Sequence, residues 1–407
     1  MNLPIEVMSG KHVDFREVLK PTPFQSRIEN YGVVQDWTSW NGYKTARVYD
    51  SLTSEYFAIR STCGVMDLTP MEKYRISGPD AMEFLNRLVT RDISGLRPNR
   101  VTYVVWCNDE GKVLDDGTIF SLGEGEYRLC SQHHQLDWLM MSSAGFDVTI
   151  SEETHSVAAL AVQGPTACSV LSSAGLHELD GLKPFDITKM TLNGFEVMVS
   201  RTGFTGDLGY ELWVDPDNAS KLWDKIFAMN EKGLFNIRPT GLSALEMVRI
   251  EAGFILPGDD FNTAETIIRA DRGRSPYELG LGWLVNLDKS FFTGQRALIE
   301  EASRPIRRRL VKLSVEGNKS PKDAFLYNRK EGARIGTIRS SVWSPILKAN
   351  LAMADVNYHK GRVPKQIWAE IYYQKELEWK ATWAQCTISD RPFWIDKRSS
   401  VSPPDNY

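Results

Sequence analysis

The sequence predicts an α+β fold of two or three domains. The 407 residues are enough for that number at roughly 150 residues per domain. Segments rich in β-branched and aromatic residues predict strands, and they recur along the whole chain. Helical patterns lie between them without a strict strand–helix–strand alternation, which favours α+β over a doubly wound parallel sheet.

Each expected element has a local reason. Strands are expected where apolar and β-branched residues concentrate, at residues 73–78, 101–107, 118–122, 127–131, 147–151, 157–164, 195–203, 309–315 and 382–388. Helices are expected where apolar positions recur at i, i+3, i+4 and i+7 after a Pro, Asn or Asp, at residues 79–89, 165–175 and 218–229. Three consecutive arginines after Pro305 separate a helical segment from a strand-rich tail, and we expect a domain boundary there.

The composition excludes several classes of protein. Lys and Arg number 48 against 52 Asp and Glu, and the net charge of -4 gives no field that would attract nucleic acid or an anionic membrane. No apolar run approaches the roughly 18 residues of a membrane span, and residues 1–15 lack the apolar core of a leader peptide. Five cysteines without CxxC spacing favour a cytoplasmic protein, and six histidines without ligand spacing predict no metal site.

A pair of aspartates follows a polar turn between Cys107 and Phe120. Gly111 suits a hairpin turn, and Asp115 and Asp116 then begin the return strand with their side chains on opposite faces. Only one of them can therefore face a core or a cleft. Taken alone, such a pair is typical of a solvated turn, and a functional site is the second interpretation.

Three glycines, Gly203, Gly206 and Gly209, occur in the run SRTGFTGDLGYEL. This spacing lets the backbone approach a ligand closely. Glu211 lies in the strand that follows, where an unpaired buried carboxylate would be costly. Its partner is either Arg201 or a ligand that presents two parallel N–H donors.

A further helix is expected after Pro239 and Gly241, with Arg249 near its end. A structural ion pair with a carboxylate is the first interpretation of Arg249, and a ligand contact is the second.

Together these segments resemble the T-protein (aminomethyltransferase) superfamily of tetrahydrofolate-dependent enzymes, from about Thr22 to about Asp390. The SRTGFTGDLGYEL run is the most specific marker. The other matching segments are DLTPM, ISGPDA, VTRDIS, QGP, PYELGLGW and GTIRSSVWSP.

The resemblance implies a three-domain ring, or cloverleaf, around a central folate channel, with a β-rich C-terminal domain that closes it. Domain one would comprise residues 1–70 and 154–242 and bind the pterin. Domain two would comprise residues 71–153 and 243–303 and carry the catalytic aspartate, and residues 304–407 would form the C-terminal domain.

The resemblance also assigns individual residues. Glu211 matches the glutamate that recognises the pterin, since a carboxylate accepts from the ring N3–H and the 2-amino group as a bidentate pair. Asp116 matches the catalytic aspartate beside the folate nitrogens that receive the carbon. Tyr103 and Arg249 match side chains of the folate channel, and Phe204, in the glycine run, is assigned to cofactor binding.

The chain departs from glycine-cleavage T-proteins where the one-carbon donor should approach, at residues 36–50, 128–135 and 245–246. These departures resemble the branches that demethylate dimethylsulfoniopropionate, methoxyaromatic compounds or N-methyl glycines. The candidate pocket residues, provided that they face the channel, are Trp37, Trp40, Tyr43, Trp106, His133 and His134.

We therefore expect a methyltransferase or demethylase that moves a methyl group from a small S-, O- or N-methylated donor to tetrahydrofolate. The alternative is a divergent aminomethyltransferase, which would need a lipoylated carrier protein as its partner. A non-catalytic folate-binding protein is the lower alternative, because residues 289–297 lack the cysteine of the folate-binding iron-sulfur assembly factor.

Overall fold

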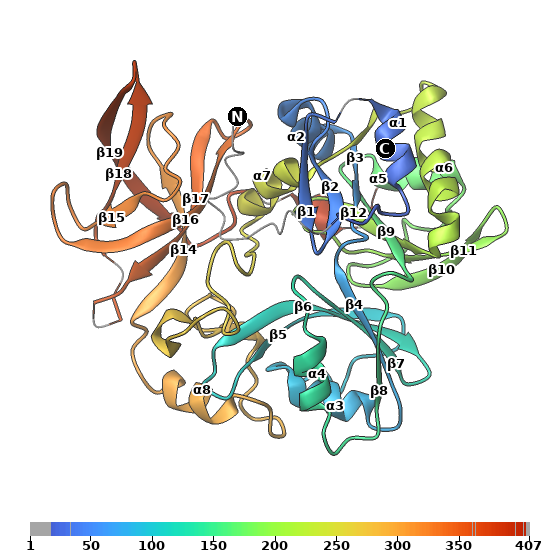
Figure 1. Ribbon diagram of the computed structural model, residues 1–407, viewed down its shortest axis with the longest axis horizontal. Coiled ribbons are helices and arrows are strands. Elements are labelled where there is room, and N and C mark those ends of the chain that lie inside the picture. Colours follow the sequence, from blue (N-terminus) through green and yellow to red (C-terminus); the bar gives the residue numbers. More distant parts are fainter. Residues whose placement is uncertain are drawn as a thin grey trace.

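The computed structural model describes residues 18–32, 34–359, 361–362, 364–394, 396–401 and 403. Three β structures make up its three lobes, and helices cover one face of each of the two larger sheets (Figure 1). Within the described part of the chain, no helix combines the length and apolar character needed to cross a membrane. Residues 1–15, which sequence analysis expects to hold no leader peptide, lie outside the described residues.

The first β structure is a six-stranded sheet. Its strand order is β10 (Ile187–Leu192), β11 (Phe195–Ser200), β12 (Gly209–Val214), β9 (Ala158–Gln163), β3 (Cys63–Asp67) and β13 (Ile237–Pro239). All neighbours are antiparallel except β13, which runs parallel to β3. One face packs on α1 (Gln25–Tyr31), α5 (Ala167–Ala174) and α6 (Ala219–Glu231) around a large apolar core.

The second β structure is a five-stranded antiparallel sheet. Its order is β5 (Arg100–Cys107), β6 (Val113–Gly123), β7 (Glu126–Ser131), β4 (Glu72–Ser77) and β8 (Thr149–Glu152). Its outer face packs on α3 (Ala81–Leu88) and α4 (Leu136–Ser142), and the fully buried Trp106 is part of this outer core.

The inner faces of these two sheets meet. Side chains alternate between faces along a strand, so Phe120 projects from the same face of β6 as Asp116, and Trp213 from the same face of β12 as Glu211. The Phe120 and Trp213 rings make an edge contact, with centroids 5.0 Å apart. They belong to one apolar cluster, the inter-sheet cluster: Trp40, Met66, Leu68, Val101, Phe120, Cys130, Ala159, Ala161, Ile187, Met198 and Trp213.

The third β structure is a closed six-stranded barrel. Its order is β14 (Arg308–Val315), β17 (Ala349–Asn357), β16 (Arg334–Ser344), β15 (Phe325–Tyr327), β18 (Ile367–Lys375) and β19 (Glu378–Ser389), and α8 (Gln295–Ala302) precedes it. The predicted α+β class and the predicted β-rich C-terminal region are confirmed. The division into domains at residues 70, 153, 242 and 303 stays a prediction.

The remaining elements connect the lobes. A hairpin of β1 (Asp36–Trp40) and β2 (Tyr43–Val48) leads to α2 (Leu52–Ser61), which packs on α7 (Leu242–Ala252). In Figure 1, α7 lies between the barrel and the six-stranded sheet. Short 3-10 helices occupy Pro216–Asn218, Ala270–Arg272, Gly282–Leu284 and Lys397–Ser399.

Candidate active site

Asp116 lies on the inner face of the five-stranded sheet, early in β6. Its side chain is 92% buried, with a residual exposure of 8%, and it accepts a hydrogen bond from the Tyr103 hydroxyl on β5. Burial is the main cause that raises the pKa of Asp116 to about 7, the Asp115 carboxylate adds to it, and the Tyr103 hydrogen bond opposes both. A carboxyl group with this pKa exchanges a proton near neutral pH.

Asp115 faces the other way, as the alternation of a strand predicts. It is fully buried and accepts hydrogen bonds from the backbone N–H of Asp116 and of His133, each at 2.9 Å. The His133 ring lies beside it, with Nδ1 3.5 Å from Asp115 Oδ2. Asp115 therefore connects the start of β6 to the turn after β7.

Glu211 lies on β12, whose inner face meets the five-stranded sheet. Its carboxylate accepts from the Thr202 hydroxyl, which in turn contacts the Ser200 hydroxyl at 2.7 Å. Among the described residues its hydrogen-bond partners are hydroxyls and include no cation, and Arg201 instead donates to backbone carbonyls. Burial raises the pKa of Glu211 to about 7.

The loop before Glu211 is held by Gln163. Its amide donates to the Thr202 carbonyl at 3.2 Å and accepts from the Thr205 hydroxyl at 2.8 Å. A Cβ atom at either Gly203 or Gly209 would lie 2.1 Å from Gln163 Oε1. The two glycines therefore leave the space that the Gln163 side chain occupies, and the sequence analysis missed the role of Gln163.

Two residues assigned to the cofactor, Phe204 and Tyr103, form aromatic pairs. Phe204 stacks on Phe254, with ring centroids 5.2 Å apart and planes 19° apart. The Tyr103 ring lies 6.2 Å from that of Trp283, whose side chain is 65% exposed. Phe254 and Trp283 were not singled out by the sequence analysis, because neither forms a recognisable pattern with its distant partner.

Arg249 makes the structural ion pairs that its first interpretation predicts. The side chain is 1% exposed, its Nε and Nη2 atoms donate to Glu246 at 2.8 and 2.6 Å, and Nη1 donates to Asp260. These carboxylates raise the pKa of Arg249 above its usual range, against the effect of burial. Arg249 thus holds the segment after α7 in place; its assignment to the cofactor stays a prediction.

The six pocket candidates are dispersed. Trp40 belongs to the inter-sheet cluster and is 8% exposed, and its buried indole N–H has no hydrogen-bond partner among the described residues. Trp37 packs at the edge of the core beside the six-stranded sheet, with Lys44 over its ring. Trp106 lies on the sheet face opposite Asp116 and donates to Gln135. Tyr43 contacts His155 through its hydroxyl. Of the four tryptophans and tyrosines, only Trp40 belongs to the inter-sheet cluster.

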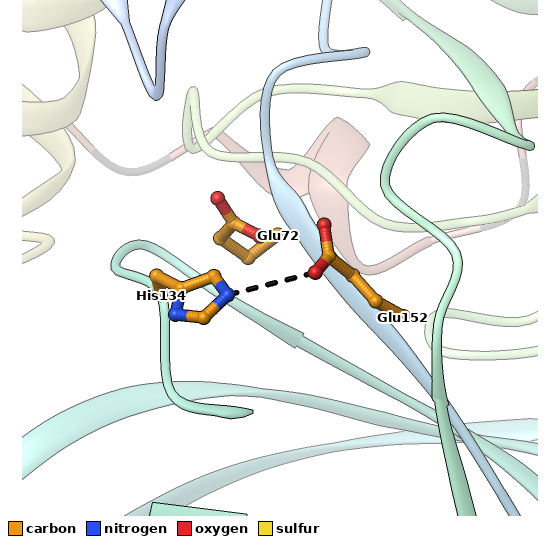
Figure 2. Close-up of side chains that lie close together, drawn as sticks. All are labelled: Glu72, His134 and Glu152. Atoms are coloured by element: carbon orange, nitrogen blue, oxygen red, sulfur yellow. Dashed lines mark ion pairs between the residues drawn. The ribbon is translucent and has the colours of Figure 1, made fainter. Parts of the chain in front are cut away.

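The histidines lie near the turn after β7. His134 is paired with Glu152 at 3.5 Å, and Glu72 lies beside them (Figure 2). One ligand atom from each of the three residues lies within 4.8 Å of the others. Glu72 already accepts from Thr154 at 3.0 Å, and His134 and Glu152 are exposed, so the arrangement is that of a solvated ion pair and we assign no metal to it.

Comparison with known proteins matches two adjoining family models. Residues 24–289 match the GCVT N-terminal domain, and residues 308–394 match the glycine cleavage T-protein C-terminal barrel domain. The chain belongs to the glycine-cleavage T-protein family. The second matched range, residues 308–394, contains all six strands of the closed barrel of this T-protein-family chain.

Relatives within the family are similar along most of their length. An aminomethyltransferase of Halothermothrix orenii is 33% identical over 326 residues, which cover 79% of this chain and 87% of the relative. One of Streptomyces coelicolor is 34% identical over 328 residues, covering 79% and 85%. The crystal structure of glycine cleavage system aminomethyltransferase T from Bartonella henselae has a TM-score of 0.80 at 23% identity and covers 95% of this chain and 100% of that one, which confirms the T-protein fold.

Membership of the T-protein family makes the chain a one-carbon transferase, and the cofactor of the family's aminomethyltransferases is tetrahydrofolate. The residues present fit this group. Glu211 is a desolvated carboxylate without a cationic partner among the described residues, as a ligand with parallel N–H donors requires. The fit therefore rests on the chemistry of the acceptor and not on the family match alone.

Proposed function

We propose that this T-protein relative transfers a methyl group from a small methylated donor to tetrahydrofolate, with the pterin on Glu211 and the reacting end beside Asp116. The observation that carries the proposal is the pair of carboxylates on the inner faces of two contacting sheets. Burial raises the pKa of each to about 7, and two such groups on facing surfaces are typical of an active site.

Bound tetrahydrofolate supplies the nitrogen nucleophile that accepts the carbon. Glu211 accepts hydrogen bonds from the pterin N3–H and 2-amino group, so the ring is fixed in one orientation. Asp116 holds or removes the proton of the reacting nitrogen and stabilises positive charge that develops there. The Tyr103 hydroxyl donates to Asp116 and holds it in position.

The surroundings of Trp40 support a small methylated substrate as the one-carbon donor. Trp40 presents a buried indole N–H that finds no acceptor in the described part of the chain. It lies in an apolar cluster against which Met71, Leu242 and Leu245 also pack. A buried donor of this kind is costly until a ligand satisfies it. Apolar surroundings with one N–H group suit a substrate whose methyl group lies next to a single hydrogen-bond acceptor. A carboxylate of the methylated substrate would be such an acceptor.

An aminomethyltransferase is the second candidate. It is supported by relatives that are 28–34% identical to this chain and are described as aminomethyltransferases. Under this alternative the donor is an aminomethyl group on a lipoylated carrier protein, and the products are 5,10-methylenetetrahydrofolate and ammonia. A sequence identity this low is compatible with a different one-carbon donor, so the donor has to be identified by experiment.

The test identifies the folate product. The purified protein is incubated with tetrahydrofolate and a panel of sulfonium, methoxyaromatic and N-methylated compounds, and folates are separated by mass spectrometry. We expect 5-methyltetrahydrofolate with one donor class. A 5,10-methylene product that forms only with an aminomethyl-lipoyl carrier would replace the proposal with the second candidate, and folate binding without either product would favour the non-catalytic alternative.

A further inference from the structure

A cationic cavity lies where the segment after α7 meets the barrel. Its volume is about 250 Å³. Its lining includes four arginines and two aspartates: Arg272, Arg274, Arg334, Arg339, Asp260 and Asp355. The arginines come from both sides of the junction, since Arg272 and Arg274 precede the barrel whereas Arg334 and Arg339 lie on β16.

The two aspartates of this cavity are already neutralised. Asp355 pairs with Arg274, and Asp260 pairs with Arg249, which lies outside the lining. Among the described residues, Arg272, Arg334 and Arg339 form no ion pair with a carboxylate side chain. The cavity therefore carries three guanidinium groups whose charge the protein does not balance.

Two of these guanidinium groups are held in place. Arg339 donates to the Asp260 carbonyl at 3.3 Å and to Asn262 Oδ1 at 3.0 Å. Arg334 donates to the Thr337 hydroxyl at 2.9 Å and lies 3.7 Å over the Phe325 ring. A guanidinium has five N–H donors, so both side chains retain donors for a ligand. Because they are positioned in advance, binding orders fewer side chains.

We propose that this cavity binds a compact oxyanion with two or more negative charges, carried by phosphate or carboxylate groups. Arginine is suited to both, because its planar fork matches their oxygen atoms. The volume lies just below the roughly 300–1,000 Å³ of pockets for drug-sized ligands, so the ligand is small. None of the lining arginines belongs to the inter-sheet cluster or contacts Glu211 or Asp116, so the inference does not rest on the proposed reaction.

The test is isothermal titration calorimetry of the full-length protein at low ionic strength. Pyrophosphate and citrate are titrated as separate probes, with chloride as the buffer anion. We expect one of the two probes to bind at one site and the affinity to fall as salt is added, because exposed charges are screened. Tighter binding of pyrophosphate would indicate a phosphorylated ligand, and tighter binding of citrate a carboxylate ligand.

The variants locate the site. Arg334→Gln and Arg272→Gln should each weaken binding about tenfold or more, since a hydrogen bond to a charged group contributes at least that much. The Arg272 side chain makes no hydrogen bond with the described residues. Its backbone N–H donates to Arg269 and its carbonyl accepts from Arg274, and the variant keeps both bonds, so the replacement leaves the packing unchanged. Arg329→Gln, an exposed arginine outside the lining, is the matched control and should bind as the parent does. No binding of either probe, or equal losses in Arg329→Gln and Arg334→Gln, would overturn the proposal.

Discussion

Asp116 and Glu211 have the same electrostatic property: protein atoms displace water that would stabilise the charge of the carboxylate, from most of Asp116 and from part of Glu211. The pKa of each is raised to about 7, mainly by burial. A protein tolerates such groups when a ligand or a reaction uses them. Three substitutions separate the roles of the two.

Asp116→Asn should fold normally and lose about 10²- to 10³-fold in kcat, because it removes charge stabilisation of the transition state. Its amide still accepts from Tyr103. The measurement is folate turnover with the donor that the folate-product test identifies, alongside circular dichroism of the variant. A soluble, folded variant with near-parental turnover would contradict the role.

Tyr103→Phe should move the acidic limb of the kcat/KM profile to higher pH by about one unit, since the hydroxyl stabilises the charged form of Asp116 and that contribution is of the order of 1.5 kcal/mol. The hydroxyl lowers the pKa of Asp116, so its loss raises it. If Tyr103 merely packs, the limb will stay in place while kcat falls.

Glu211→Gln should weaken tetrahydrofolate binding and, without folate, stabilise the protein above pH 7. The folded pKa of Glu211 is raised from 4.5 to about 7, so the protein loses stability as pH rises between these values. Glutamine removes that loss, which corresponds to up to about 3 kcal/mol at pH 8 and vanishes at pH 4.

Urea unfolding of the apo protein at pH 8 and pH 4.5, together with a folate titration, measures both effects. Glu196→Gln, an exposed glutamate paired with Lys189, is the control and should change neither. A variant destabilised equally at both pH values would show that Glu211 has a structural role.

The sequence could predict these residues only by resemblance. Local reasoning placed Asp115 and Asp116 on opposite faces, and the structure agrees, but a pleat does not say which face is inner. Trp106 shows why. Trp106 lies in a strand, as predicted, but its indole is part of the outer core and does not face Asp116. The surroundings of a strand side chain depend on which element packs on that face of the sheet, and the local sequence does not specify that element.

At the scale of elements, β6 and β7 approach closely at Gly117, next to Asp116. A Cβ atom there would lie 2.0 Å from the Cys130 carbonyl oxygen, so no side chain fits. Gly117→Ala should therefore separate the strands and cost about 2 kcal/mol or more, as overpacking does. Gly95→Ala, where the added atom meets nothing within 4 Å, should be close to neutral. Urea midpoints of the two variants decide the matter.

Most elements were predictable because their patterns are local. The segments expected as strands at 101–107, 157–164 and 309–315 overlap β5, β9 and β14, and the helices expected at 79–89 and 218–229 overlap α3 and α6. The parallel pairing of β13 with β3 was not predicted. It joins residues about 170 positions apart, a separation at which the local periodicity of the sequence carries no information on pairing.

At the scale of the whole molecule, Glu251 joins the lobes. This fully buried carboxylate of α7 accepts from Tyr56 at 2.6 Å and Arg60 at 2.7 Å on α2, and from Ser344 at 2.5 Å on the barrel. Asp260 makes a second connection, since it pairs with Arg249 and accepts from Ser340. The barrel is thus tied to α7 through two carboxylates.

Glu251→Ala should cost about 3–5 kcal/mol, because it leaves Arg60 buried without its main partner. We expect differential scanning calorimetry to show the barrel unfolding separately from the rest. Glu300→Ala, whose ion pair with Arg304 is exposed, should change stability by less than about 1 kcal/mol. A single, unshifted transition in Glu251→Ala would show that the lobes are coupled by other contacts.

The position of α7 has a consequence for protease sensitivity. Leu242 and Leu245 of α7 pack against the inter-sheet cluster, whereas Glu251 and the Arg249–Asp260 pair contact the barrel. Helix α7 therefore contacts both regions. A folate analogue that binds only the native state stabilises whatever unfolds together with its site, by mass action. The analogue should therefore slow proteolytic cleavage within the distant barrel as well as within the two sheets. The rate of cleavage in the barrel would then report ligand binding at a site outside the barrel.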